Sequence, residues 1–253
     1  MKNIFFPLKM MLTVLSAKLK KEPKKDICMI AHRGYSSRYQ QNTALAFNMA
    51  AKHKSGGAET DVRITKDGQF VTNHNSEVVF ADGSEVQVAD ATLAELRAKP
   101  LKNTKTKDEI YICTFREYLE IMKANNMVCF VELKGEWPQD KIKEVFEMAD
   151  EVYDLQKVIL QSFSFDNLLL AHELFPKMPL MLTYGSAENG YERCFDHGFS
   201  IDVDYVTVSK EMIRQFHDRG LEVGVWTANT PLVFAYCKAL GVDYIESDVY
   251  GGK

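Results

Sequence analysis

Short apolar runs alternate with longer amphipathic stretches along most of this 253-residue chain. The apolar runs have the length of buried strands, and the stretches between them repeat apolar residues at helical spacing. Eight runs are candidates for parallel strands, and they begin near residues 27, 57, 127, 157, 179, 205, 222 and 243. Alternating strands and helices favour a parallel sheet, and eight such units in about 230 residues predict a TIM (β/α)8 barrel.

One hairpin-like segment, residues 62–75, breaks this alternation. It holds two strand-like runs joined at Asp67-Gly68, a dipeptide typical of two-residue hairpin loops. The runs are too close together for a parallel crossover, so the second is expected to be an antiparallel return strand. A two-residue loop here sets Asp61 directly opposite His74, and opposed residues have Cβ atoms about 5 Å apart. The hairpin is therefore expected to carry His74 to Asp61.

The chain divides into a barrel domain, an insertion and an N-terminal segment. The barrel domain is expected over residues 26–253, with an insertion at 75–113 between its second and third strands that covers or flanks the barrel mouth. Residues 1–25 carry seven lysines and one glutamate around an apolar run too short to span a bilayer. Three interpretations of this segment stay open: a helix packed across the floor of the domain, a basic amphipathic helix lying on a membrane, and a signal peptide.

Overall composition narrows the functional classes. The net charge of −4 gives no global basic field that would attract nucleic acid. The five cysteines are widely spaced and form no C-x-x-C pair, so a reducing compartment is the simpler interpretation. The expected location is cytoplasmic, with peripheral membrane contact through residues 1–25 left open.

Chemically active residues stand where the first three parallel strands are expected to end. In a TIM barrel the active site lies at the carboxyl ends of the strands. Residues two apart on a strand also point to the same face. One rim is therefore expected to carry these six side chains: His32, Arg33, Glu59, Asp61, Glu132 and Lys134.

The three carboxylates of this set predict a metal site. Carboxylates on one rim repel each other unless they are protonated or bridged by a cation. Glu59, Asp61 and Glu132 offer only oxygen ligands, which suits a hard divalent ion such as Mg²⁺ or Ca²⁺. The absence of cysteine from the cluster argues against structural zinc.

The remaining side chains of the rim suit proton transfer and phosphate binding. His32 and His74 beside a metal fit one general base and one general acid, since histidine exchanges protons at neutral pH. Arg33 and Lys134 can neutralise phosphate oxygens. The ordered set predicts a metal-dependent phosphodiesterase.

Two further features are harder to place. Asp202 and Asp204 repeat the Glu-x-Asp spacing, but they precede the strand expected near residue 205 and so are assigned to the bottom face of the barrel. Trp226 lies near the end of a strand, where core filling and pocket lining are both compatible with barrel anatomy.

At these motifs the chain resembles the glycerophosphodiester phosphodiesterase family, part of the phosphatidylinositol-phospholipase-C-like TIM barrels. The resemblance covers residues 27–249, and the matching stretches are IAHRGYSS, QNTALAF, GAETDVRITKDGQFVTNHN, TFREYL, VELK, LQSFSFD, EVGVWTAN and GVDYIESD. It implies His32 and His74 as the acid/base pair. The other implied roles are metal ligation by Glu59, Asp61 and Glu132, phosphate binding by Arg33 and Lys134, and contact of Trp226 with the glycerol end of the substrate.

The resemblance also implies a reaction, the cleavage of a small glycerophosphodiester to sn-glycerol 3-phosphate and an alcohol. In such families a substrate hydroxyl next to the phosphate can attack first, which gives a cyclic phosphate that water then opens. Two alternatives stay open. One is a lysophospholipase D that uses the same site, and the other is a catalytically silent barrel that binds phosphate or lipid.

Two departures from the family pattern remove negative charge near the expected site. The family usually reads P-E-N-T where this chain has Gln40-Gln41-Asn42-Thr43, and H-D where this chain has His74-Asn75. Glutamine keeps the size and hydrogen bonding of glutamate, and Asn75 can orient His74 without offsetting its charge. A functional site is expected, but one that is slower or shifted relative to the family pattern.

Overall fold

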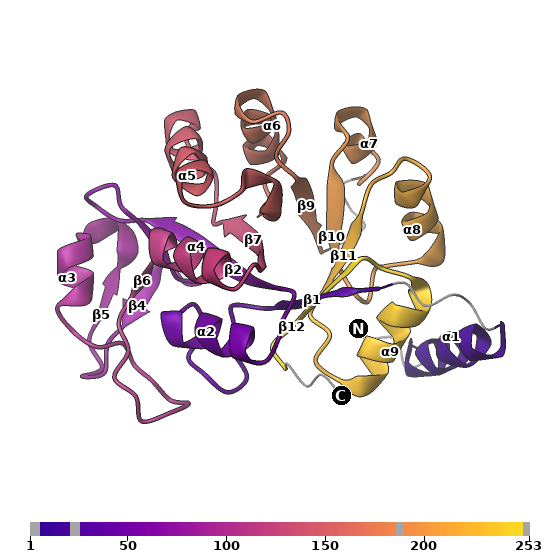
Figure 1. Ribbon diagram of the computed structural model, residues 1–253, viewed down its shortest axis with the longest axis horizontal. Helices are drawn as coiled ribbons and strands as arrows, with labels where there is room; N and C mark the ends of the chain where they lie inside the picture. The colour runs from indigo at the N-terminus through magenta and orange to yellow at the C-terminus, as the bar shows by residue number, and fades with distance from the viewer. Residues whose placement is uncertain (1–5, 21–25, 186–189, 250–253) are drawn as a thin grey trace.

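The central feature of the computed structural model is a closed barrel of eight parallel strands, within described residues 6–20, 26–185 and 190–249. Neighbouring strands pair in parallel all the way round, and β1 pairs with both β2 and β12, which closes the barrel. This confirms the expected TIM barrel (Figure 1). The barrel strands are β1 (Cys28–Ala31), β2 (Gly57–Ile64), β7 (Val128–Leu133), β8 (Val158–Ser162), β9 (Leu180–Tyr184), β10 (Ser200–Asp204), β11 (Val223–Trp226) and β12 (Tyr244–Ser247).

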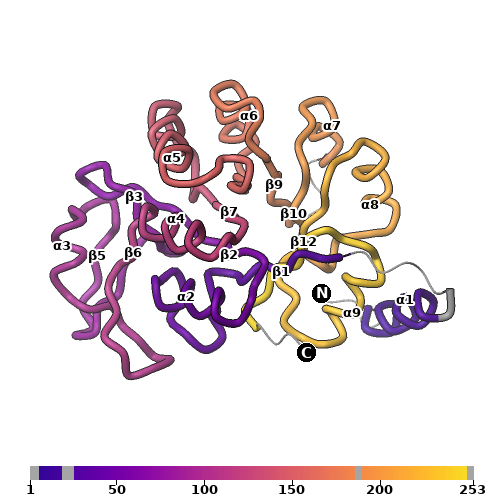
Figure 2. The backbone as a smooth tube through the Cα atoms, viewed as in Figure 1, coloured from indigo at the N-terminus to yellow at the C-terminus, as the bar shows by residue number. Residues whose placement is uncertain are grey.

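Helices surround the barrel and cover its outer face (Figures 1 and 2). Thr43 caps the helix after β1, and Thr114 opens the helix before β7 with a full capping box, which its sequence signature predicts. These helices bury their apolar faces against outward-facing strand residues in one continuous core. They are α2 (Ala44–Lys52), α4 (Phe115–Ala124), α5 (Gln139–Val152), α6 (Phe165–Leu174), α7 (Arg193–His197), α8 (Lys210–His217) and α9 (Pro231–Leu240), with a 3-10 turn at Leu155–Lys157.

The barrel interior changes from apolar to polar along the strands. Ile30, Phe130, Ile159 and Met181 form a buried apolar layer inside the barrel. Because inward-facing residues are two apart on a strand, the next inward positions toward the carboxyl ends are Glu59, Gln161 and their neighbours. The apolar layer therefore forms the floor beneath a polar mouth.

The insertion folds beside the barrel around a small core of its own, at the left of Figure 1. The return strand β3 (Phe70–Thr72) pairs antiparallel with β2, and β6 (Cys113–Thr114) extends this edge. Between them lie β4 (Glu77–Val79), β5 (Glu85–Gln87), a 3-10 turn at Val88–Asp90 and α3 (Leu93–Arg97).

The expected hairpin register is wrong by one residue. Val62 pairs with Thr72, and the amide of Asn73 donates to the carbonyl of Asp61 at 2.9 Å, so Asn73 rather than His74 stands opposite Asp61. The loop has three residues because Gly68 takes a left-handed φ of 78°, which adds one residue to the turn. His74 therefore lies just past the last paired position.

The sixth parallel strand lies earlier in the chain than the start near residue 205 that the sequence pattern predicts. It runs over Ser200–Asp204, and Tyr205 begins a turn instead of a strand. Ile201 and Val203 face the outer core, so Asp202 between them points into the barrel, where it is 1% exposed. The assignment of Asp202 and Asp204 to the bottom face is therefore wrong, since Asp204 ends the strand at the mouth.

The N-terminal helix α1 (Phe6–Lys20) packs on the outside of the barrel against α9, not across its floor (Figure 1). The ring of Phe6 lies 5.8 Å from that of Tyr236 and 6.2 Å from that of Tyr205, and Met10 is buried. Within the described residues no helix combines the length and apolar character that crossing a membrane requires. Residues 1–5 and 21–25 of the segment lie outside the described residues.

The turn that carries His32 and Arg33 depends on Gly34, and a pair of substitutions tests this. Gly34 has a φ of 77°, and a Cβ added there would lie 2.7 Å from the carbonyl carbon of Ala46. Gly83 has a similar φ of 83° with nothing within 4 Å. Gly83→Ala should lose only the left-handed strain of about 1–2 kcal/mol, whereas Gly34→Ala should lose more through the clash. Urea unfolding measures both, and equal losses would contradict this packing.

Candidate active site

The three carboxylates predicted as metal ligands meet at the barrel mouth. Glu59 and Asp61 extend from β2 and Glu132 from β7, and these strands pair so that Asp61 stands beside Glu132. One oxygen from each of the three lies within 4.8 Å of the others. Glu59 and Asp61 are only 2% and 1% exposed, so their charges have little water around them.

Two cations reach into this acidic group. Lys134 places Nζ 2.8 Å from Asp61 Oδ1 and 2.6 Å from Glu132 Oε1. Arg33 places Nε 3.3 Å from Asp61 Oδ2, and its backbone amide donates to Glu59 Oε2 at 2.8 Å. Arg33 and Lys134 are thus at the mouth, as expected.

The cations compensate the carboxylates unequally. Burial alone would raise the pKa of Asp61, but Lys134 and Arg33 outweigh it and hold that pKa below its usual value. Burial, and then the charge of Asp61, raise the pKa of Glu59 well above its usual value. Burial also raises the pKa of Glu132 despite Lys134. Negative charge at Glu59 therefore lacks a full counter-charge.

A divalent cation fits this arrangement. Among the described residues no group hydrogen-bonds Glu59 Oε1, which is buried. An unpaired buried oxygen beside two further carboxylates is the donor set that Mg²⁺ or Ca²⁺ prefers. Glu59, Asp61 and Glu132 are the residues that could hold the ion.

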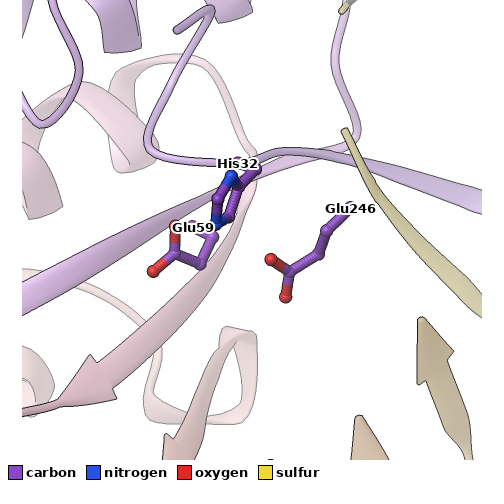
Figure 3. A group of neighbouring side chains, drawn as sticks. All are labelled: His32, Glu59 and Glu246. Atoms are coloured by element: carbon purple, nitrogen blue, oxygen red, sulfur yellow. The ribbon is translucent and has the colours of Figure 1, made fainter. Parts of the chain in front are cut away.

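His32 is held from behind by a carboxylate that the sequence analysis assigned no role. Its Nδ1 lies 2.6 Å from Asp248 Oδ1. Burial would raise the pKa of Asp248, but the hydrogen bond with His32 outweighs it and lowers that pKa to about 2. Because the ionised Asp248 can only accept, Nδ1 is the donor of this hydrogen bond, and in the neutral imidazole the lone pair is then on Nε2. Figure 3 shows the imidazole ring beside the side chain of Glu59.

His74 lies at the same mouth although the expected register was wrong. The Arg63 guanidinium donates to the carbonyl oxygen of His74 at 2.6 Å and fixes the backbone after β3. The Nδ1 atom of His74 lies 2.9 Å from Asn75 Oδ1, so Asn75 orients the ring as expected. Burial lowers the pKa of His74, while the nearby charge of Asp61 acts in the opposite direction.

Asn42 is a positioning residue that the sequence analysis missed. It is 2% exposed, donates from Nδ2 to Asp61 Oδ2 at 2.7 Å and accepts from Thr60 Oγ1 at 2.9 Å. Its φ of 55° is left-handed, a conformation that asparagine tolerates better than most residues. The neighbouring Gln41, which departs from the family pattern, accepts from Arg33 Nη1 at 3.0 Å.

A second buried polar group lies deeper in the barrel and was also missed. Gln161 donates from Nε2 to Glu246 Oε1 at 2.7 Å, and Glu246 lies with Glu59 and His32 in one cluster (Figure 3). Burial, and then Asp202, raise the pKa of Glu246 well above its usual value. Strand periodicity could have identified Glu246, because it follows Tyr244 by two residues and therefore points to the same inward face of the 243–247 strand.

Trp226 ends β11 at the rim, next to Phe163 at a ring separation of 6.1 Å. Its Nε1 is buried and hydrogen-bonds to none of the described residues.

Beside the mouth lies a cavity of about 680 Å³. Its lining includes four residues of the barrel, His32, Arg33, Gln41 and Asp248, and two residues of the insertion, Thr104 and Lys105. The insertion therefore flanks the mouth. The sequence also makes the loop after β9 a candidate for contact with the substrate, because it follows a strand end, but residues 186–189 of this loop lie outside the described residues.

Barrel and rim together define a TIM-barrel phosphoric diester hydrolase. The chain belongs to the glycerophosphoryl diester phosphodiesterase family, whose model matches residues 32–251. This confirms the resemblance and the enzyme class expected from the motifs.

Individual relatives agree with this assignment. A glycerophosphodiester phosphodiesterase of Bacillus altitudinis is 26% identical over 232 residues, covering 87% of this chain and 94% of the relative. The structure of the Thermotoga maritima glycerophosphodiester phosphodiesterase superimposes with a TM-score of 0.72 at 26% identity, covering 89% of this chain and 96% of that one. An Oleispira antarctica phosphodiesterase, solved in complex with the product sn-glycerol-3-phosphate, has the same fold with a TM-score of 0.77 at 19% identity. This comparison covers 91% of this chain and 94% of that one.

The contact between Asp248 and His32 can be tested by removing one charge. Asp248→Asn keeps the shape of the side chain but no longer stabilises a protonated His32, so kcat should fall by at least about tenfold. Asp150→Asn, on the exposed side of α5, is the matched control and should leave kcat unchanged. Steady-state kinetics with melting curves measure both variants, and a fully active Asp248→Asn would exclude this role.

Proposed function

We propose that this protein hydrolyses glycerophosphodiesters to sn-glycerol 3-phosphate and an alcohol, assisted by Mg²⁺ or Ca²⁺. The single observation that carries the proposal is the convergence of Glu59, Asp61 and Glu132 within 4.8 Å at the barrel mouth, with His32 beside them. Family membership supports the substrate class and favours an enzyme over a silent binding barrel. The product bound by the Oleispira antarctica relative supports the identity of the product.

In this proposal Glu59, Asp61 and Glu132 hold the cation, which when bound stabilises negative charge on the phosphoryl oxygens and orients the attacking hydroxyl. Arg33 and Lys134 bind the phosphate by charge-assisted hydrogen bonds. Both are anchored to Asp61, so their charges are fixed before the substrate arrives. Trp226 and its neighbour Phe163 form the apolar side of the rim for the glycerol carbons.

The two histidines divide the proton transfers. The substrate hydroxyl next to the phosphate attacks phosphorus, and neutral His32 takes the proton of this hydroxyl at Nε2. Asp248 stabilises the positive charge that His32 then carries. His74 donates a proton to the alcohol oxygen as its bond to phosphorus breaks. Burial lowers the pKa of His74, so a protonated imidazole there gives up its proton more readily, while a smaller fraction of the protein carries that proton at neutral pH. These transfers release the alcohol and leave a cyclic phosphate. When water opens the cyclic phosphate, the two histidines exchange roles, so His74 takes the proton of the water and His32 returns its proton to the substrate oxygen.

Replacing either histidine tests these roles. His32→Ala and His74→Ala should each lower kcat by about 10²–10⁴-fold, because each removes one proton carrier. His172→Ala serves as the control, since His172 lines a different cavity and contacts Phe199. Release of sn-glycerol 3-phosphate from glycerophosphocholine is the measurement. Unchanged turnover in either active-site variant, with the fold intact, would refute its role.

Metal removal tests the ligand group independently. EDTA should abolish hydrolysis, and Mg²⁺ or Ca²⁺ should restore it. Isothermal titration with either ion should give one site per chain, weakened by at least about tenfold in Glu132→Gln because one charged ligand is lost. Glu136→Gln, just beyond β7, is the control. Full activity in EDTA, or equal affinity in Glu132→Gln and the wild type, would exclude this site.

A further inference from the structure

Helix α1 exposes an apolar face that nothing in the described structure covers. Leu8, Met11, Leu12 and Leu15 are 53%, 58%, 57% and 53% exposed. Their spacing of three, four and seven residues puts them on one side of the helix, within an arc of about 100°. Half of the strongly exposed large apolar residues among those described thus lie on one helix.

The opposite face of the same helix is already used. Phe6, Met10 and Val14 pack against the main core, which fixes the direction of the exposed face. Lys9 and Lys18 are exposed, and at about 100° per residue they lie on opposite sides of the apolar stripe, about 60° and 20° beyond its ends. An apolar stripe bordered by lysines is typical of helices that lie in a membrane surface.

The distribution of charge along the chain also favours a helix that lies on a membrane surface. Residues 1–25 have a net charge of +6, because they hold seven lysines and one glutamate. The whole chain has a net charge of −4, so the rest of it carries −10. A basic segment on an acidic protein fits an anionic lipid surface, to which each nearby lysine adds attraction. Two copies of this segment would repel each other, which disfavours a dimer through the same face.

The N-terminal end of α1 lies on the mouth side of the barrel. The ring of Phe6 contacts that of Tyr205, which directly follows the carboxyl end of β10. The amide of Tyr205 donates to the carbonyl of Trp226 at 3.0 Å, at the same rim. Phe6, at the start of α1, therefore lies on the same side of the barrel as the active-site opening.

We propose that α1 docks this protein on an anionic membrane surface. Leu8, Met11, Leu12 and Leu15 enter the boundary between headgroups and acyl chains, and the flanking lysines contact lipid phosphates. This docking goes beyond the proposed hydrolysis and does not depend on it. The lysophospholipid alternative likewise requires contact with a lipid surface, which this docking provides.

Vesicle sedimentation of the full chain tests the docking. The wild type should bind vesicles of mixed phosphatidylcholine and phosphatidylglycerol, and should bind pure phosphatidylcholine at least about tenfold more weakly. Met11→Gln/Leu12→Gln should bind the anionic vesicles at least about tenfold more weakly, because it removes apolar area from the inserted face. Tyr111→Gln, which alters a 44% exposed residue of the insertion, is the control and should bind like the wild type.

The outcomes separate docking from its competitors. Equal vesicle binding by the wild type and Met11→Gln/Leu12→Gln, or binding by neither, overturns the proposal. A dimer of the wild type without lipid that the double variant abolishes would assign the face to a second copy instead. Hydrolysis of water-soluble glycerophosphocholine should be the same in all three proteins, so a failure of docking is distinguishable from a failure of the proposed function.

Discussion

Lys134 joins Asp61 and Glu132 through two short ion pairs among largely buried side chains, and the rest of the site depends on this contact. Like charges buried together destabilise a fold strongly unless counter-charges and hydrogen bonds accompany them. Arg33 supplies the second cation, and Asn42 donates to the oxygen of Asp61 that Lys134 leaves open. The loop after β1 is thus held to β2 by the charge of Asp61, which the proposed metal site also uses.

The same constraint explains the layering of the barrel interior. An apolar floor excludes water from below, which strengthens every charge interaction above it. Asp202 and Glu246 lie between this floor and the rim, where Gln161 satisfies one oxygen of Glu246. Gly224 makes room for Asp202, because a Cβ there would lie 2.4 Å from Asp202 Oδ1. The polar interior therefore depends on a missing side chain as well as on those present.

The ends of the first three parallel strands were predictable from the sequence, whereas the end of β10 and the side-chain partners across the barrel were not. Glu59, Asp61 and Glu132 could be placed because strand spacing alone sets their face and their end of the barrel. The predicted hairpin register was wrong because Asp67-Gly68 occurs in both two- and three-residue loops, and only the surrounding packing selects between them. Asn42 and Asp248 contact residues far away in sequence, so no local pattern could assign their roles.

Residues 1–25 illustrate a different limit. The alternatives of a packed helix and a membrane-surface helix looked exclusive, because a sequence pattern does not say how many faces of a helix find a partner. The structure gives α1 two apolar faces, one packed against α9 and one exposed beside two lysines. Packing on one side holds the other side outward in a fixed direction. Because the phosphate and glycerol parts of a soluble diester and a lysophospholipid are alike, this outward face, not the rim, would separate the two substrates.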